Sequence, residues 1–411
     1  MINKKFYLVV YVFLLIVYTR FFEFRPAETL FIRSTVLVFF VLLAFTIRRL
    51  TYEKGHFIKP IKLIIFSFFL AIIPSALFWS QDIFQSLVAI APYSYFLLFL
   101  FLIEARINKD VIIKTLLVLA YVGLILFLYQ FFFTTTVLFG GKEEFLEDRG
   151  VIRILFPGEG FTFFALFYYL NKLSKKFKLK HLLLLLPFLV MMLMQVTRIY
   201  ILAFGLIAIY HFMIKSKVKY RIGGIIIFLV CYLYYNNTEN AIVKGIRDAT
   251  ENDVEQKEDY IRLIEAEYFL YEFSNHTTTY LLGNGAYNYN SSYGKKILSL
   301  NENEHFFLED IGIVKGYILF GILFVFGYIL IFIKSFTIKI PHNQLYLKYY
   351  IWMILILSFT TRANTSAGFG VVLVSVLYLF ELAYLEQNNL IETKSTGMLK
   401  RNFKQYSPSK T

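Results

Sequence analysis

Apolar runs fill most of this chain, and one long polar interruption, 236–305, separates the last three runs from the others. A segment of roughly 17–25 apolar residues is long enough to cross a bilayer. Its backbone groups must form hydrogen bonds within the segment, which favours a helix. The pattern predicts an all-α integral membrane protein with one large external loop. About twelve runs are candidate transmembrane helices: 6–22, 29–47, 61–79, 83–103, 111–133, 154–170, 181–196, 199–214, 221–235, 312–333, 346–361 and 367–385.

The polar interruption sets the predicted organisation of the chain. Four parts are expected: a transmembrane bundle of about nine helices at 1–235, an external loop at 236–305, further transmembrane helices at 306–385 and a basic tail at 386–411. Within the loop, 254–273 predicts an amphipathic helix that lies against the outer membrane face or the bundle. Its apolar residues recur on one helical face: Ile261, Ile264, Tyr268 and Tyr271.

The basic residues orient the predicted bundle. If the N-terminus is cytoplasmic, the inner segments and their flanks hold 27 of the 42 Lys and Arg residues. Because short cytoplasmic loops carry an excess of these residues, we predict that both termini are cytoplasmic, that 236–305 faces outward and that the protein lies in the cytoplasmic (inner) membrane. Anionic lipid of the inner leaflet accounts for the net charge of +14. Membrane lipid is therefore an expected partner, and nucleic acid is not.

The type of basic residue also differs between the two sides. The inner segments hold 22 Lys and 5 Arg, whereas the outer segments hold 6 Lys and 9 Arg. The planar guanidinium of Arg binds phosphate or carboxylate through two parallel hydrogen bonds. The excess of outer Arg therefore favours an anionic ligand at the outer face, although ion pairs with outer carboxylates would also explain part of it. The outer Arg residues are Arg20, Arg25, Arg33, Arg149, Arg153, Arg198, Arg247, Arg262 and Arg362.

Three outer residues stand where chemistry could occur. His305 lies where the polar interruption meets the next apolar run, among several carboxylates, and histidine can act as a base near neutral pH. A structural interfacial histidine held by one of those carboxylates is the alternative. Arg198 lies in a tight outer hairpin, and a charge there is costly unless it points into the bundle or reaches the interface. Glu159, at the start of a run, is a similar candidate or a structural partner of Arg153.

The chain contains no nucleotide-binding loop, no paired Asp-x-Asp metal motif and no Gly-x-Ser-x-Gly nucleophile elbow. An enzyme of this sequence would therefore work without a cofactor or a metal, on a substrate that already carries its leaving group.

Residues 185–330 resemble the O-antigen polymerase and O-antigen ligase superfamily of bacterial surface-polysaccharide enzymes. The resemblance is carried by four pieces in order: VTRIYILAFGLIAIY (196–210), YIRLIEAEYFLYEF (260–273), LLGNGAYN (281–288) and EHFFLEDIGIVKGYILFG (304–321). It implies a donor glycan linked through diphosphate to a polyprenyl lipid at the outer face of the cytoplasmic membrane.

The resemblance also implies roles for individual residues. Arg198 and Arg262 would contact the diphosphate or the glycan, joined by Arg149 or Arg153 in the preceding outer loop. His305 would be the base on the acceptor hydroxyl. The family often has Asn after this histidine, where Phe306 stands here, and Asn near the position of Glu159. Glu304 and Glu309 are therefore alternative bases.

We favour a polymerase that joins lipid-linked repeat units, with a chain-length regulator protein as an expected further partner. A ligase that transfers the glycan to a lipid A core or another surface acceptor shares these motifs. A lipid-linked oligosaccharide flippase or other transporter is the alternative outside enzymes. That class would be expected to show two related halves, which this sequence lacks.

Overall fold

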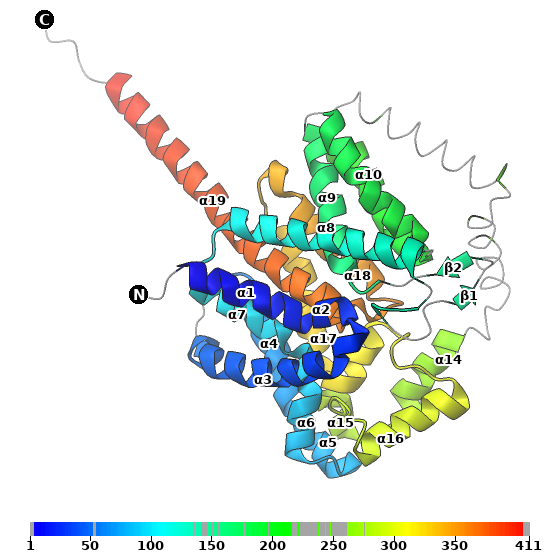
Figure 1. The fold of residues 1–411 in the computed structure, drawn as a ribbon. Coiled ribbons are helices and arrows are strands. Elements are labelled where there is room, and N and C mark those ends of the chain that lie inside the picture. Colours follow the sequence, from blue (N-terminus) through cyan, green and yellow to red (C-terminus); the bar gives the residue numbers. More distant parts are fainter. Residues whose placement is uncertain are drawn as a thin grey trace, which may run out of the picture.

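The computed structural model of the 411-residue chain is built almost entirely from helices (Figure 1). It describes residues 4–51, 55–134, 136–140, 146–148, 151–153, 156–175, 178–195, 197–215, 221, 237–238, 243, 247, 261–274 and 276–405. Within these ranges, the β-strands are β1 (Leu146–Asp148) and β2 (Val151–Arg153), which form a small antiparallel hairpin.

Six helical segments of the described chain are long and apolar enough to cross a membrane: Arg25–Thr51, Ile58–Trp79, Ile83–Ala105, Lys109–Phe133, Ile313–Thr337 and Ala367–Asn388. Shorter apolar helices span Lys5–Tyr18, Leu179–Met194, Arg198–Ile214 and Tyr346–Leu357. These lengths and compositions are those of a multi-pass membrane protein. Helix is present in eleven of the twelve predicted runs, and 222–235 lies outside the described residues.

The elements follow one another as named helices. The first half of the chain contains α1 (Lys4–Tyr18), α2 (Arg20–Glu23), α3 (Glu28–Thr46), η2 (Ile47–Thr51), α4 (Ile58–Leu70), α5 (Ile72–Trp79), α6 (Ile83–Ile90), η3 (Ala91–Phe96), α7 (Leu97–Ala105), α8 (Lys109–Phe133), α9 (Glu159–Lys175), α10 (Leu179–Met194) and α11 (Arg198–Tyr210). The second half contains α14 (Ile261–Glu267), η5 (Tyr268–Glu272), α15 (Thr277–Leu282), α16 (Ser292–Ser299), η6 (Leu300–Glu304), α17 (Ile313–Thr337), η7 (His342–Gln344), α18 (Tyr346–Leu357), η8 (Arg362–Asn364) and α19 (Ala367–Gln405), which continues through most of the predicted tail.

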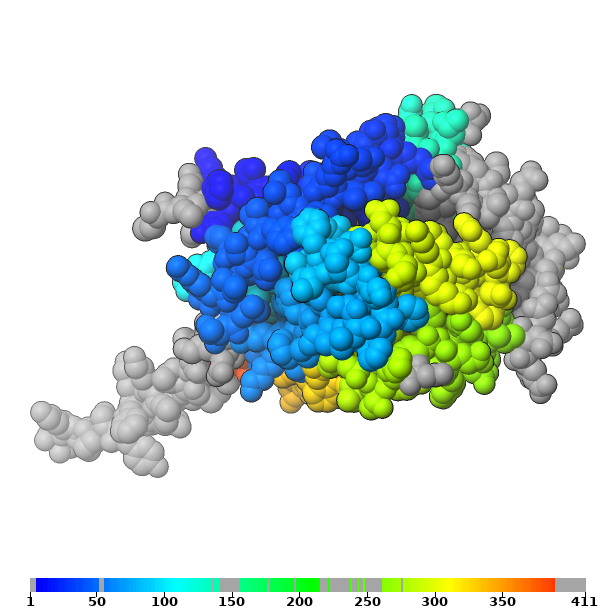
Figure 2. Space-filling view, turned by 90° about the horizontal axis from the view of Figure 1, so that it is seen from below, coloured from blue at the N-terminus to red at the C-terminus, as the bar shows by residue number. Residues whose placement is uncertain are grey.

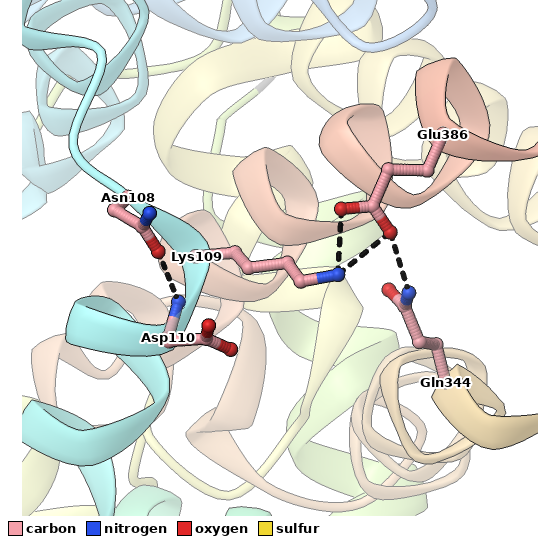
Figure 3. Close-up of polar contacts among 5 residues, drawn as sticks. All are labelled: Asn108, Lys109, Asp110, Gln344 and Glu386. Carbon is pink, nitrogen blue, oxygen red and sulfur yellow. Dashed lines mark hydrogen bonds and ion pairs between the residues drawn. The ribbon is translucent and has the colours of Figure 1, made fainter. Parts of the chain in front are cut away.

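Polar contacts hold together the end of the bundle where α1 begins and α8 starts, which we call the terminal end. The ammonium of Lys109 lies 2.6 Å from both carboxylate oxygens of Glu386 on α19, and Gln344 of η7 donates to the same carboxylate at 3.1 Å (Figure 3). Asn108 caps α8 by accepting a hydrogen bond from the backbone N–H of Asp110 (Figure 3). These contacts join three elements that are far apart in sequence.

The opposite end, which we call the loop end, collects the connections that include α14–α16 and η8. The backbone N–H of Ile313 donates to the carbonyl of Ser358 at 2.6 Å, which joins the start of α17 to the end of α18. The backbone N–H of Arg25 donates to the carbonyl of Leu138 at 3.0 Å, which joins the loops after α2 and α8. Segments from both halves of the chain therefore meet at this end.

The described part of the predicted external loop is fixed to the bundle. Backbone N–H groups of Asn284 and Gly285 donate to the carbonyls of Ile318 and Leu319, at 2.7 and 2.8 Å, where Gly321 interrupts α17 with a φ of 71°. The loop thus donates hydrogen bonds to carbonyl groups of α17 that lack an intrahelical partner where the helix is interrupted. Figure 2 shows this yellow and green segment lying alongside the light-blue surface of α5 and α6.

Gln81, which is fully buried, forms hydrogen bonds with the loop residues that follow Gly285. Its amide donates to the carbonyl of Ala286 at 2.8 Å, and its side-chain oxygen accepts from the backbone of Asn288 and the hydroxyl of Ser291, both at 2.8 Å. Trp79 adds a hydrogen bond from its indole N–H to the Asn284 side chain at 2.8 Å. Gln81 and Trp79, at the connection between α5 and α6, therefore fix the position of a loop some two hundred residues later in sequence.

The predicted amphipathic helix is present in its described part as α14 and η5, but a different face contacts the bundle. Glu265, Phe269 and Phe273 are buried, whereas Ile261 and Tyr271 of the predicted apolar face are exposed. The prediction missed this because Glu265 is buried with a hydrogen bond to a neighbouring loop, which hydrophobic periodicity does not reveal.

Replacing Gly283 with alanine is expected to destabilise the protein strongly. Gly283 has a φ of 82°, and an added Cβ would lie 2.4 Å from the carbonyl oxygen of Leu319, which is backbone and has little room to move. We expect a clear fall in the thermal unfolding temperature of the purified protein in detergent. Gly205→Ala is the matched control, because a Cβ at Gly205 would meet nothing within 4 Å. Equal unfolding temperatures for the two variants would contradict the proposed tight packing of the loop.

Candidate functional site at the loop end

Arg362 stands in the middle of the charged groups of the loop end. It begins η8, whose first turn is capped by the Thr361 hydroxyl accepting from the backbone N–H of Ala363 at 3.3 Å. The buried carbonyl of Asn364 accepts hydrogen bonds from the hydroxyls of Tyr95 at 3.1 Å and Tyr328 at 2.8 Å. Two buried tyrosines therefore fix the short helix that carries Arg362.

The surroundings of Arg362 are strongly acidic. Burial lowers the pKa of its guanidinium, but the carboxylates of Glu309, Glu23 and Glu159 outweigh this effect, so the pKa is raised and the cation is stabilised. Protein groups surround the Arg362 guanidinium, although the residue as a whole is accessible to solvent. Arg362 can therefore reach a ligand from solvent while its charge is held in place.

Glu309 links Arg362 to a second, buried cation. Its carboxylate lies 2.5 Å from the ammonium of Lys315, whose side chain is 4% exposed, whereas the Glu309 side chain is 39% exposed. Burial raises the pKa of Glu309, but Lys315, Arg362 and a hydrogen bond from Tyr287 together hold it below its usual value. Glu309 is therefore an ionised carboxylate between two cations, which makes it a weak base at neutral pH.

The structure brings Glu159 close to Arg362 and Arg262 to the chain segment that leads to it. Glu159, the first residue of α9, interacts electrostatically with Arg362 and accepts a hydrogen bond from the Tyr200 hydroxyl at 2.6 Å. Arg262 on α14 donates to the carbonyl of Thr360 at 3.4 Å, two residues before Arg362. Residues of α9 and α11 therefore surround the guanidinium of Arg362, and α14 contacts the backbone two residues before it.

Arg198 lies close to the same group of segments. It is the first residue of α11 and is partly buried, and it precedes by two residues the Tyr200 that binds Glu159. Arg153 pairs through its backbone with Leu146 in the β1–β2 hairpin, and its side chain lies outside the described residues. Arg149 also lies outside the described residues, so the predicted pairing of Glu159 with Arg153 stays a prediction.

His305 lies apart from the contacts that surround Arg362. It follows η6 with a φ of 55°, is exposed, and has no side-chain hydrogen bond or ion pair within the described part of the chain. A hydrogen bond fixes the loop that carries His305: the buried carboxylate of Glu265 accepts from the backbone N–H of Phe307 at 2.9 Å. Burial raises the pKa of Glu265 despite this hydrogen bond. His305 is thus an exposed residue on a loop that a hydrogen bond holds in position.

A groove of about 380 Å³ adjoins the loop of His305. It combines aromatic faces with three carboxylates and one ammonium, and the neighbours of His305 on either side, Glu304 and Phe306, are part of it. The rings of Tyr268 and Phe306 stand 5.3 Å apart at its wall. The other residues that line it are Ile264, Glu267, Glu272, Lys296 and Leu300.

Sequence reasoning recognised the outer Arg set but did not single out Arg362 or Lys315. Arg362 lies outside the stretch that carries the family resemblance, and a single Arg between two apolar runs gives no pattern. The available signal was Glu309, whose charge at the start of an apolar run needs a partner, and Lys315 six residues later could supply it. Within the described ranges, no group of three His, Cys, Asp or Glu side chains is arranged to hold a metal ion.

No protein-family model matches the chain, and no curated protein matches its sequence.

Proposed function

We propose that this protein is a membrane glycosyltransferase of the polysaccharide-polymerase kind, which transfers a polyprenyl-diphosphate-linked glycan onto a sugar hydroxyl of another lipid-linked repeat unit. In this proposal the bundle crosses the cytoplasmic membrane about twelve times, with both termini inside and the loop end outside. The observation that supports the proposal is the interaction of Arg362 with Glu159 and with Tyr200 of α11, the helix that begins at Arg198, together with the contact of Arg262 with Thr360 just before Arg362.

The arginines would hold the diphosphate leaving group. As the glycosidic carbon is attacked, negative charge grows on the diphosphate, and guanidinium groups already in position stabilise it without reorganisation. Arg362 is suited to this task because three carboxylates keep it charged and oriented while it remains exposed. Arg262 and Arg198 would complete the set from α14 and α11.

The acceptor would lie on the side of His305. Sugar rings bind by stacking on aromatic faces and by hydrogen bonds to carboxylates, and the groove beside His305 offers both through Tyr268, Phe306, Glu267 and Glu304. His305 would accept the proton of the acceptor hydroxyl. Glu309 is a poorer candidate for the base than the sequence suggested, because Lys315 and Arg362 hold its pKa low.

Complementation of a strain that lacks the gene tests these roles, scored by the surface-polysaccharide ladder on a gel. Arg262→Ala and His305→Ala are each expected to reduce the ladder to a single repeat at normal protein level, and Arg198→Lys, which keeps a cation without the planar guanidinium, is expected to shorten it. A loss of about 10²–10³ in rate is the usual effect of removing one such charge-stabilising group. Arg33→Ala, which removes an exposed outer arginine of α3, is the control and should leave the ladder intact.

Two other results would change the conclusion. Loss of all surface glycan with accumulation of long lipid-linked chains would mean a ligase, since polymerisation would then be intact. An unchanged ladder in all three variants would rule out the proposed roles and favour transport.

A further inference from the structure

A second groove, of about 520 Å³, lies at the terminal end of the bundle, away from the charged loop end. It runs along α4 from Lys59 and Lys62 to Phe69, with Leu50 of η2 on its other side. The backbone N–H of Phe57, just before α4, donates to Glu381 on α19 at 2.7 Å, five residues before the Glu386 of the terminal-end contacts. The groove therefore starts at the polar boundary of the bundle.

The polarity of the groove changes along its length. Lys59 and Lys62 stand at its beginning, and Leu63, Phe66 and Phe69 continue it toward the middle of the helix. Ten residues separate Lys59 from Phe69, which is about 15 Å along a helix. Phe66 is 56% exposed on this surface. A cationic end and an apolar wall that together extend about 15 Å match an anionic headgroup and the first part of an acyl chain.

The two lysines have no anionic partner of their own. Within the described part of the chain, neither Lys59 nor Lys62 makes a hydrogen bond or an ion pair, whereas the neighbouring Arg49 pairs with Glu104. They also stand in the first turns of α4, where the helix dipole disfavours cations and favours an anion. A bound phosphate would neutralise both lysines.

We propose that this groove binds one anionic phospholipid of the surrounding leaflet, with its phosphate between Lys59 and Lys62 and an acyl chain along Leu63, Phe66 and Phe69. A zwitterionic lipid is disfavoured because its own cation would face two ammonium groups. Free phosphate is disfavoured because it would leave the apolar wall unused. The binding does not depend on the proposed glycosyltransferase activity.

Native mass spectrometry of the full-length protein in detergent tests the binding. With added phosphatidylglycerol, we expect one tightly retained lipid on the wild type, and with phosphatidylcholine none. Lys59→Gln/Lys62→Gln is expected to weaken retention about 30-fold, the effect of removing two lysines near an anionic headgroup. Lys59→Arg/Lys62→Arg should keep the lipid, since the charge remains.

The matched control removes two lysines elsewhere at the same end. Lys178→Gln/Lys180→Gln, which changes two exposed positions at the start of α10, should retain phosphatidylglycerol as the wild type does. Equal retention by all variants, or equal loss from both glutamine pairs, would overturn the proposal in favour of bulk lipid attraction. Competition by inorganic phosphate alone would overturn the part played by the acyl chain.

Discussion

Replacing Arg362 with glutamine is expected to abolish polymer formation while the protein still accumulates in the membrane. Glutamine keeps much of the length and hydrogen-bonding capacity of arginine but removes the charge that would meet the diphosphate. Groups that stabilise developing charge in a preorganised site contribute about 10²–10³ in rate each. The surface-polysaccharide ladder should therefore collapse to a single repeat, as expected for Arg262→Ala.

Two further variants separate charge from folding. Arg362→Lys keeps a cation but loses the planar guanidinium, so we expect a partial ladder. Arg33→Gln makes the same chemical change on an exposed arginine of α3 and should leave the ladder intact. Normal polymer from Arg362→Gln would show that Arg362 is only a structural partner of Glu309 and Glu159, and the site would have to be sought elsewhere.

The helices were predictable because a membrane imposes a simple rule on sequence. Long apolar runs such as 111–133 and 312–333 correspond closely to α8 and α17, since backbone groups in lipid have no other partners than their own helix. The break in α17 at Gly321 was not predictable in the same way. It depends on Asn284 and Gly285, which satisfy the opened carbonyls from a loop that hydropathy only marks as polar.

The candidate site was predictable only as a set of residue types. The excess of outer Arg indicated an anionic ligand, the resemblance selected Arg198 and Arg262, and the start of an apolar run marked Glu159. Glu159 interacts with Arg362, and Arg262 contacts the carbonyl of Thr360 two residues before it. Arg362 was missed because its importance arises from tertiary neighbours, three carboxylates from three separate segments. His305 was selected by its position in the chain, but its exposed loop carries no contact that would orient an imidazole within the described structure.

The second large effect concerns stability. Glu309→Gln removes the carboxylate that neutralises the buried ammonium of Lys315, and an unpaired buried charge is costly. Because Glu309 itself is partly exposed and screened by solvent, we expect a loss of roughly 2–4 kcal/mol in the free energy of unfolding. Glu302→Gln, at an exposed position of η6, is the control and should change stability little. Thermal unfolding of the purified protein in detergent measures both.

The pH dependence follows from the direction of the Glu309 shift. Its pKa is lowered in the folded protein, so the stability it contributes is present above the unfolded value, about 4.3, and is lost as pH falls through the folded value. Wild type should lose stability more steeply than Glu309→Gln below that pH. The double variant Glu309→Gln/Lys315→Met should regain most of the loss, since no buried charge remains. If it were no more stable than Glu309→Gln, the cost would lie in the packing around residue 309, and the ion pair would not be what joins the loop before α17 to that helix.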